Sequence, residues 1–165
     1  MAENGALRFG DLVRRELIID RLEAGTREEA LTHMAGFLVE HGYCGQGYVE
    51  AILEREAAHP SALPMAGHKI AIPHADATHV LSSALLFARL VQPVEFRSMG
   101  NPDERLQVDM ISMFALKEKK RIGDLLETLI TVYQHQEILQ AIHDAVDSAE
   151  VYSLLQKNVE RYSTA

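Results

Sequence analysis

Cysteine is almost absent from this chain of 165 residues, since Cys44 is the only one. An internal disulfide framework and a cysteine-rich zinc site are therefore excluded. Long apolar runs are also missing, and none approaches the roughly 20 residues that a membrane-spanning helix needs. Basic residues are fewer than acidic ones, and the net charge of -8 disfavours a nucleic-acid surface, which needs clustered lysine and arginine. A basic protein is the easier partner to accommodate.

The chain has no internal repeat and no low-complexity segment, and 165 residues can form one core without metals or disulfides. We therefore expect a single domain over residues 1–165, with an ordered core from about residue 12 to residue 156. The first residues lack a basic segment followed by an apolar one. This pattern predicts no secretory signal and a cytoplasmic location.

Short apolar runs alternate along the chain with amphipathic segments of helical period. The runs at 84–88 and 108–116 are almost continuously apolar, which is typical of strands that are covered on both faces. This alternation predicts an α/β fold, in which a mixed β-sheet of about five strands is covered by helices on both faces. The expected strands are residues 17–19, 70–72, 84–88, 94–96 and 108–116, with 94–96 at an edge of the sheet.

Capping residues indicate where several helices begin and end. Thr26 starts a segment with the spacing of a capping box, and Gly42 supplies a stop at the other end. A second helix, over about residues 46–57, must end before Pro60. Further amphipathic helices follow residue 121, and the last of them begins at a second capping box at Asp147.

The stretch from Ile70 to His74 singles out one reactive side chain. Residues Ile70 to Ile72 have strand character, and Pro73, which has no N–H, cannot continue a ladder. His74 is therefore placed at a strand end, held by a rigid element yet able to face solvent. Its ring is largely neutral near pH 7, because the reference pKa is about 6.5, and neutral imidazole is a nucleophile. We interpret His74 as the reactive residue.

The hexad Ile70-Ala71-Ile72-Pro73-His74-Ala75 follows a helix that ends in Glu54-Arg55-Glu56. Together they resemble the active-site signature of the fructose/mannitol-type EIIA domains of the bacterial phosphoenolpyruvate-dependent sugar phosphotransferase system (PTS). The helix start at residues 26–30 is similar to that family, and the resemblance covers nearly the whole chain. Within the family, residues 60–64 and 79–84 are most similar to the galactitol-type branch.

The resemblance implies a phosphoryl carrier that needs no cofactor and no metal. His74 would take a phosphoryl group from the phosphohistidine of HPr and pass it to the cysteine of a cognate EIIB, which serves a membrane EIIC permease for a sugar or polyol. Arg55 matches the family's phosphate-facing arginine, whose planar fork suits an oxyanion. The mannitol-type members carry a second histidine where Arg121 stands here. The resemblance thus implies His74 as the phosphorylated nucleophile, with Arg55 and Arg121 as phosphate-binding cations.

Two alternatives remain open from the sequence. Some EIIA-like domains regulate other proteins by their phosphorylation state and feed no sugar. A metal-dependent hydrolase is the other alternative, although its potential ligands match neither a helical i,i+4 pair nor a paired Cys/His zinc pattern. These ligands are His59, His68, His74, Asp76 and His79. The identity of the sugar cannot be read from this sequence, because an EIIA domain binds other proteins and never the sugar itself.

Overall fold

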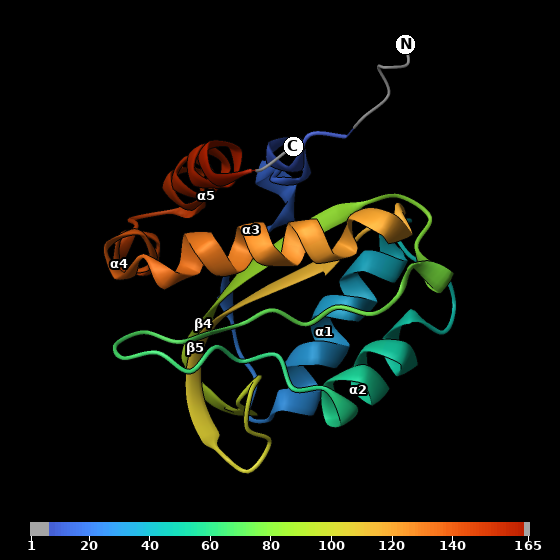
Figure 1. Ribbon diagram of the computed structural model, residues 1–165, viewed down its shortest axis with the longest axis horizontal. Coiled ribbons are helices and arrows are strands. Elements are labelled where there is room, and N and C mark those ends of the chain that lie inside the picture. Colours follow the sequence, from blue (N-terminus) through green and yellow to red (C-terminus); the bar gives the residue numbers. More distant parts are fainter. Residues whose placement is uncertain (1–6, 164–165) are drawn as a thin grey trace.

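A four-stranded mixed β-sheet forms the middle layer of the computed structural model, which describes residues 7–163 (Figure 1). Its strands are ordered β2-β4-β5-β3, and the two central strands, β4 and β5, are antiparallel. Each edge strand runs parallel to its neighbour, β2 to β4 and β3 to β5. The bounds are β2 Ile18–Leu22, β3 Ile70–Ala71, β4 Ala84–Arg97 and β5 Arg105–Ala115.

The strand count differs from the expected number because one strand is longer than its sequence pattern predicts. Residues 84–88 and 94–96 both belong to β4, and both pair with β5. A register shift between Arg89 and Val94 separates the two paired stretches. Pro93 lies inside this shift, where its missing N–H interrupts no regular ladder. The described sheet therefore has four strands rather than about five, and 94–96 is not a separate edge strand.

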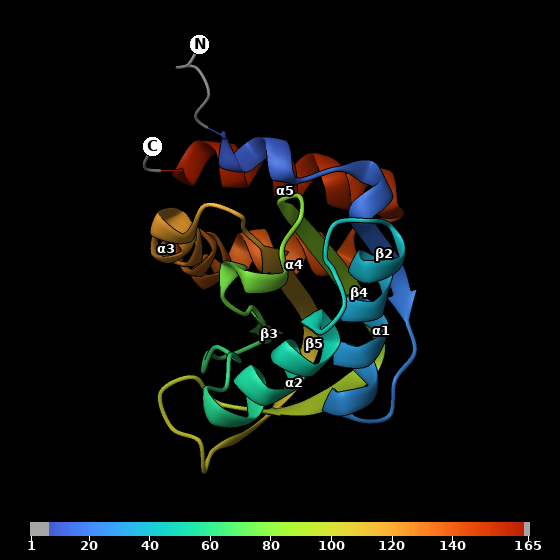
Figure 2. The same cartoon turned by 90° about the vertical axis from the view of Figure 1, so that its right-hand side faces the viewer.

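Helices cover both faces of the sheet, which confirms the expected α/β architecture (Figures 1 and 2). Helices α1 and α2 pack on one face, and α3, α4 and α5 pack on the other. Alternate side chains of β4 enter the two cores, so that Leu86 lies with α1 and α2 while Phe87 lies with the other group. None of these described helices is long and apolar enough to cross a membrane. Their bounds are α1 Arg27–Glu40, α2 Tyr48–Ala58, α3 Ile122–Gln134, α4 Gln136–Asp144 and α5 Ser148–Tyr162.

The packed part of the chain extends beyond the expected residues 12–156. Phe9 lies in the short 3-10 helix Phe9–Leu12 and is only 1% exposed. At the other end, α5 continues to Tyr162 and buries Val159. Both ends are ordered because their apolar side chains complete the core that α3, α4 and α5 form on the sheet. Further 3-10 helices are Arg15–Leu17, Ala77–His79 and Lys119–Arg121.

The predicted helix caps occur at the expected residues. The Thr26 side chain accepts from the backbone N–H of Glu29, and the Glu29 carboxylate accepts from the backbone N–H of Thr26. Asp147 likewise accepts from the backbone N–H of Glu150. Helix α2 begins later than residue 46, because Gly47 precedes it with a φ of 94°, a left-handed conformation that glycine adopts readily.

The capping box of α1 gives a stability prediction. Thr26→Ala removes the acceptor for the Glu29 N–H, so we expect the free energy of unfolding to fall by about 1 kcal/mol. Thr32 is exposed in the interior of the same helix, and Thr32→Ala is the matched control. Because alanine is the better helix former there, the control should not be destabilised. Urea unfolding followed by circular dichroism measures both, and equal losses in the two variants would contradict the capping role.

Candidate functional site

His74 lies directly beyond β3, on a backbone that is held from both sides. The N–H of Ile72 donates to the carbonyl oxygen of Ser61 at 3.1 Å, and the N–H of Phe114 donates to the carbonyl oxygen of Pro73 at 3.2 Å. Pro73 has no N–H that would need a partner, yet its carbonyl keeps β5 alongside. The strand ends at Ala71, one residue before the predicted end at Ile72, and His74 follows three residues later.

One hydrogen bond and one stacked ring fix the imidazole of His74. Its Nδ1 lies 2.9 Å from the carbonyl oxygen of Ile72. The ring stacks on Phe114, with centroids 4.7 Å apart and planes 10° from parallel. A carbonyl oxygen can only accept, so Nδ1 carries the proton and Nε2 keeps its lone pair. Nε2 is therefore the nitrogen that can attack an electrophile.

The surroundings keep this ring neutral. Desolvation by burial is the largest cause that lowers the pKa of His74 below the ordinary value for histidine. The carbonyl of Ile72 raises this pKa in part, and the positive charge of Arg55 lowers it further. The neutral, nucleophilic form therefore predominates at pH 7.

His74 and Arg55 line the same open pocket, of about 270 Å³. The wall of this pocket combines polar groups near the end of α2 with apolar side chains from other parts of the chain. The exposed Arg55 forms no ion pair with any residue between 7 and 163, so its guanidinium is available to an anion. The other lining residues are Ala58, His59, Pro60, Ser61, Met99, Pro102 and Leu126.

Glu56 is a buried carboxylate behind this pocket, and the sequence interpretation missed it. It is 3% exposed, and it accepts from the backbone N–H of Ser61 at 2.9 Å and from the Ser61 hydroxyl at 2.7 Å. Burial raises the pKa of Glu56, and these two hydrogen bonds lower it in part. Glu56 thereby fixes Ser61, whose carbonyl holds the strand before His74. One signal could have found it, since Glu56 falls four residues after Ile52 on the buried face of α2.

Asp76 shapes the turn after His74. One of its carboxylate oxygens accepts from the backbone N–H of Thr78 at 3.0 Å and caps the 3-10 helix Ala77–His79. The hydrogen bonds from Thr78 are the largest causes that lower the pKa of Asp76. Asp76 also lines, with Arg55, a second pocket of about 260 Å³ beside the first. Its carboxylate stays ionised near neutral pH and already has a partner, so a proton-accepting role is not indicated.

Arg121 lies in other surroundings. Its Nη1 donates to the carbonyl oxygen of Leu7 at 2.6 Å, and its guanidinium lies 4.4 Å from the ring centroid of Phe9. Glu118 forms an ion pair with it at 3.4 Å. Arg121 is not part of the pocket wall that contains His74 and Arg55. The structure thus brings His74 and Arg55 together and packs Arg121 on the N-terminal segment, and a phosphate role for Arg121 stays a prediction.

The remaining histidines near the site are dispersed. His59 lines the pocket that contains His74, whereas the ring of His79 packs against Gly47. His68 contacts Asp109 instead, with its Nδ1 3.1 Å from a carboxylate oxygen. Within residues 7–163, the ligands of the metal-hydrolase alternative do not gather into one cluster. The geometry therefore gives that alternative no support.

A family model described as phosphoenolpyruvate-dependent sugar phosphotransferase system, EIIA 2, matches residues 11–158. The chain belongs to this family. The galactitol-specific EIIA component of the PTS of Escherichia coli K12 is 28% identical over 116 residues, which cover 70% of this chain and 77% of that protein. A nitrogen regulatory protein of Bradyrhizobium diazoefficiens is 29% identical over 149 residues, or 88% of this chain and 92% of that protein.

Solved structures of EIIA proteins have the same fold. The complex of enzyme IIA-mannitol with phosphorylated enzyme IIB-mannitol from E. coli matches at 25% identity with a TM-score of 0.71, covering 86% of this chain and 95% of that one. The nitrogen regulatory protein IIA-Ntr of Neisseria meningitidis matches at 21% identity with a TM-score of 0.72, covering 88% and 97%. The resemblance recognised in the hexad is confirmed, and this chain is an EIIA component of the phosphotransferase system.

The neutral state of His74 in this EIIA component gives a prediction. Nuclear magnetic resonance titration of the ring carbons should place its pKa below 6.5. Arg55→Gln removes a positive charge and should raise that pKa, but not to the unperturbed value, because desolvation is the larger cause. Arg21 is exposed on β2 and is not among the charges that act on His74, so Arg21→Gln is the control. A pKa at or above 6.5 in the unmodified protein would contradict this account.

Proposed function

We propose that this EIIA component accepts a phosphoryl group on Nε2 of His74 and passes it to a cognate EIIB protein. The proposed donor is the phosphohistidine of HPr, and the EIIB serves a membrane EIIC permease for a sugar or polyol. The fixed tautomer is the observation that carries the proposal. Because Nδ1 donates to the Ile72 carbonyl at 2.9 Å, the lone pair stays on Nε2, in a residue that shares its pocket with Arg55.

The transfer needs no proton acceptor at the attacking nitrogen. The Nε2 lone pair of His74 forms a bond to phosphorus while the bond from phosphorus to the HPr imidazole breaks. The His74 ring then carries a positive charge, and the Ile72 carbonyl, 2.9 Å from Nδ1, stabilises it. In the second step the thiolate of the EIIB cysteine attacks phosphorus, and His74 leaves as the neutral ring. The hydrogen bond between Nδ1 and the Ile72 carbonyl therefore holds the ring both when His74 accepts the phosphoryl group from HPr and when it passes the group to EIIB.

Arg55 is the cation that we assign to the phosphoryl oxygens. Phosphoryl transfer depends on positioning and on charge that neutralises the equatorial oxygens. Arg55 is exposed on the last turn of α2 and lines both pockets beside the nucleophile. Its planar guanidinium can donate two hydrogen bonds to one phosphoryl group.

The pocket wall also suits a protein partner that docks briefly. Met99, Pro102 and Leu126 supply apolar contacts around His74, and Arg55 supplies charge at their margin. A cognate EIIB is supported as a partner by the solved E. coli complex, in which the mannitol EIIA binds phosphorylated EIIB. A carrier must release each partner after transfer, so we expect a small interface and fast dissociation for both HPr and EIIB.

A regulatory role is the second candidate function. The nitrogen regulatory protein of B. diazoefficiens matches 88% of this chain, a larger share than the 70% matched by the galactitol-specific component. Phosphorylation of His74 would then change the binding of a target protein instead of feeding an EIIB. The cytoplasmic location expected from the sequence stays a prediction for either function.

A phosphorylation assay tests the nucleophile. With phosphoenolpyruvate, enzyme I and HPr, we expect labelled phosphoryl to reach the chain and to disappear in His74→Ala. The variants His33→Ala, His59→Ala and His68→Ala should retain the label, which should be labile in acid and stable in alkali. Full incorporation into His74→Ala would refute the assignment. Onward passage to an added EIIB supports transport, whereas retention of the label with every EIIB tried favours the regulatory function.

Rapid-quench measurements of the rate of phosphoryl transfer distinguish the roles of Arg55 and Arg121. Arg55→Ala removes a charge-assisted contact of about 1.5 to 3 kcal/mol, so transfer should slow by roughly tenfold to a hundredfold at an unchanged melting temperature. Arg121→Ala loses the contacts with Leu7 and Phe9, so its melting temperature should fall while transfer stays fast. A slow Arg121→Ala that Arg121→His partly restores would instead place Arg121 at the phosphoryl group.

A further inference from the structure

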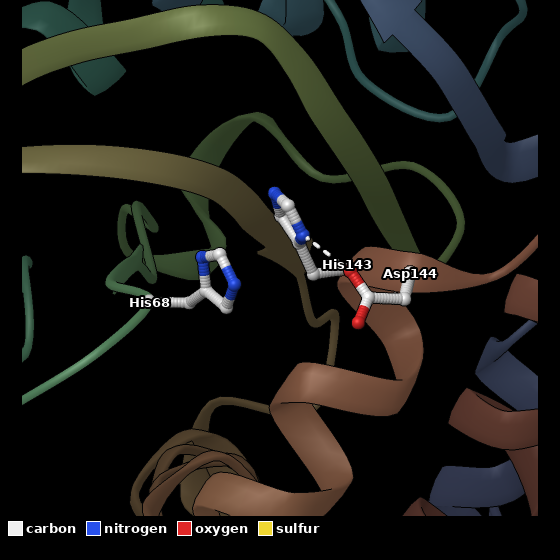
Figure 3. A group of neighbouring side chains, drawn as sticks. All are labelled: His68, His143 and Asp144. Carbon is white, nitrogen blue, oxygen red and sulfur yellow. Dashed lines mark hydrogen bonds and ion pairs between the residues drawn. The ribbon is translucent and has the colours of Figure 1, made fainter.

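Three potential metal ligands converge at the end of β3 that lies away from His74. His68 precedes β3, whereas His143 and Asp144 are the last two residues of α4 (Figure 3). One potential ligand atom from each of the three lies within 4.8 Å of the other two. They form a separate group, because His74 follows β3 and His68 comes before it.

The fold brings these distant residues together through the core. Leu139 and Ile142 on the buried face of α4 pack in the same cluster as Ile70 of β3. The last turn of α4 is thereby seated beside the start of β3, and the rings of His68 and His143 stack with centroids 3.7 Å apart. Both side chains are partly buried, with 27% and 35% exposed, so folding has already restricted their freedom.

Asp109 holds His68 in the orientation of a metal ligand. A carboxylate oxygen of Asp109 lies 3.1 Å from Nδ1 of His68 and accepts the backbone N–H of Lys69 at 3.3 Å. A proton on Nδ1 leaves the lone pair of His68 on Nε2. A histidine that donates one ring N–H to a carboxylate and presents the other nitrogen is the arrangement that tunes most histidine metal ligands.

The second histidine has to turn before it can share an ion with the first. Stacked rings direct their lone pairs along their own planes, which are 21° from parallel for His68 and His143. The side chain of Asp144 is 59% exposed, and His143 lines an open pocket of about 380 Å³. Both therefore have room to rotate, at the cost of the 3.0 Å hydrogen bond between them and of the one from Gln140 to Asp144. The ligand atoms now lie within 4.8 Å of one another, and such a rotation would let each of them lie roughly 2.0–2.2 Å from one shared zinc ion.

Charges of both signs surround the three potential ligands. Lys69 directly follows His68, Arg21 lines the same pocket as His143, and Arg89 donates to the carbonyl oxygens of Ile142, His143 and Ala145 at the end of α4. The charge of Arg89 is offset by the ion pair with Asp20. The carboxylates of Asp109 and Asp144 then remain beside the two imidazoles.

We propose that His68, His143 and Asp144 bind one divalent transition-metal ion of the zinc type, with Asp109 orienting His68. Two imidazoles, one carboxylate and a water molecule make a tetrahedral set that suits such an ion. The ion would join β3 to α4 without contacting the phosphoryl site. Its effect would be on stability, because a ligand that binds only the folded state raises the melting temperature.

Calorimetric titration of the full chain, free of any polyhistidine tag, with zinc chloride tests the site. We expect one ion per chain, and a dissociation constant at least about tenfold weaker in His68→Gln and in His143→Gln. Asp109→Asn should weaken binding by about tenfold to a hundredfold through the lost orientation. His33 is exposed on α1, and His33→Gln is the control that should bind like the unmodified chain. Unchanged affinity in the two site variants would overturn the proposal.

Cobalt substitution provides a measurement that does not depend on the folding of variants. Paramagnetic Co²⁺ should shift or broaden the ring signals of His68 and His143 at one equivalent and leave those of His74 and His59 unchanged. Zinc should also raise the melting temperature of the unmodified chain but not of His143→Gln. The absence of any stoichiometric binding, or perturbation confined to His59 and His74, would refute the site and leave the two rings as a stacked pair only.

Discussion

The hydrogen bond between His74 Nδ1 and the carbonyl oxygen of Ile72 is the contact on which the proposed chemistry of this EIIA component depends. It fixes the tautomer, and stacking on Phe114 fixes the plane of the ring. This bond forms only while the backbone of β3 stays in place, and β3 is two residues long. The support comes from neighbours, since Ser61 accepts the N–H of Ile72 and the buried carboxylate of Glu56 holds Ser61. A buried acid on α2 thus supports the orientation of the proposed nucleophile on another segment.

The two ends of β3 have opposite electrostatic surroundings. His74 follows the strand and shares its pocket with the cation Arg55, which suits an anionic phosphoryl group. His68 precedes the strand and lies beside the carboxylate of Asp109, which suits a bound cation. Imidazole has the same intrinsic chemistry at both ends, so the neighbouring charges decide which partner each ring can accept.

Features that depend on neighbouring residues were predictable from the sequence. Thr26 caps α1 because a side-chain oxygen accepts from a backbone N–H three residues away, a contact that local stereochemistry determines. Pro73 prevents β3, which ends at Ala71, from continuing for an equally local reason, its missing N–H. His74 could be singled out as the candidate reactive residue from that strand end and the hexad around it. The alternation of apolar runs with amphipathic helices likewise predicted the α/β architecture.

The sequence by itself therefore determined the fold class, most of the elements, the family and the candidate nucleophile, while tertiary structure decided how strands merge and which distant side chains meet. The merging of residues 84–88 and 94–96 into one strand depends on their common pairing with β5. Arg121 packs on Phe9, and His68 stacks on His143, because helix packing places separate segments of the chain side by side. Periodicity reports which face of an element is buried, but not which residue of another element lies opposite. That choice is made by the order of the strands and the packing of the helices on them.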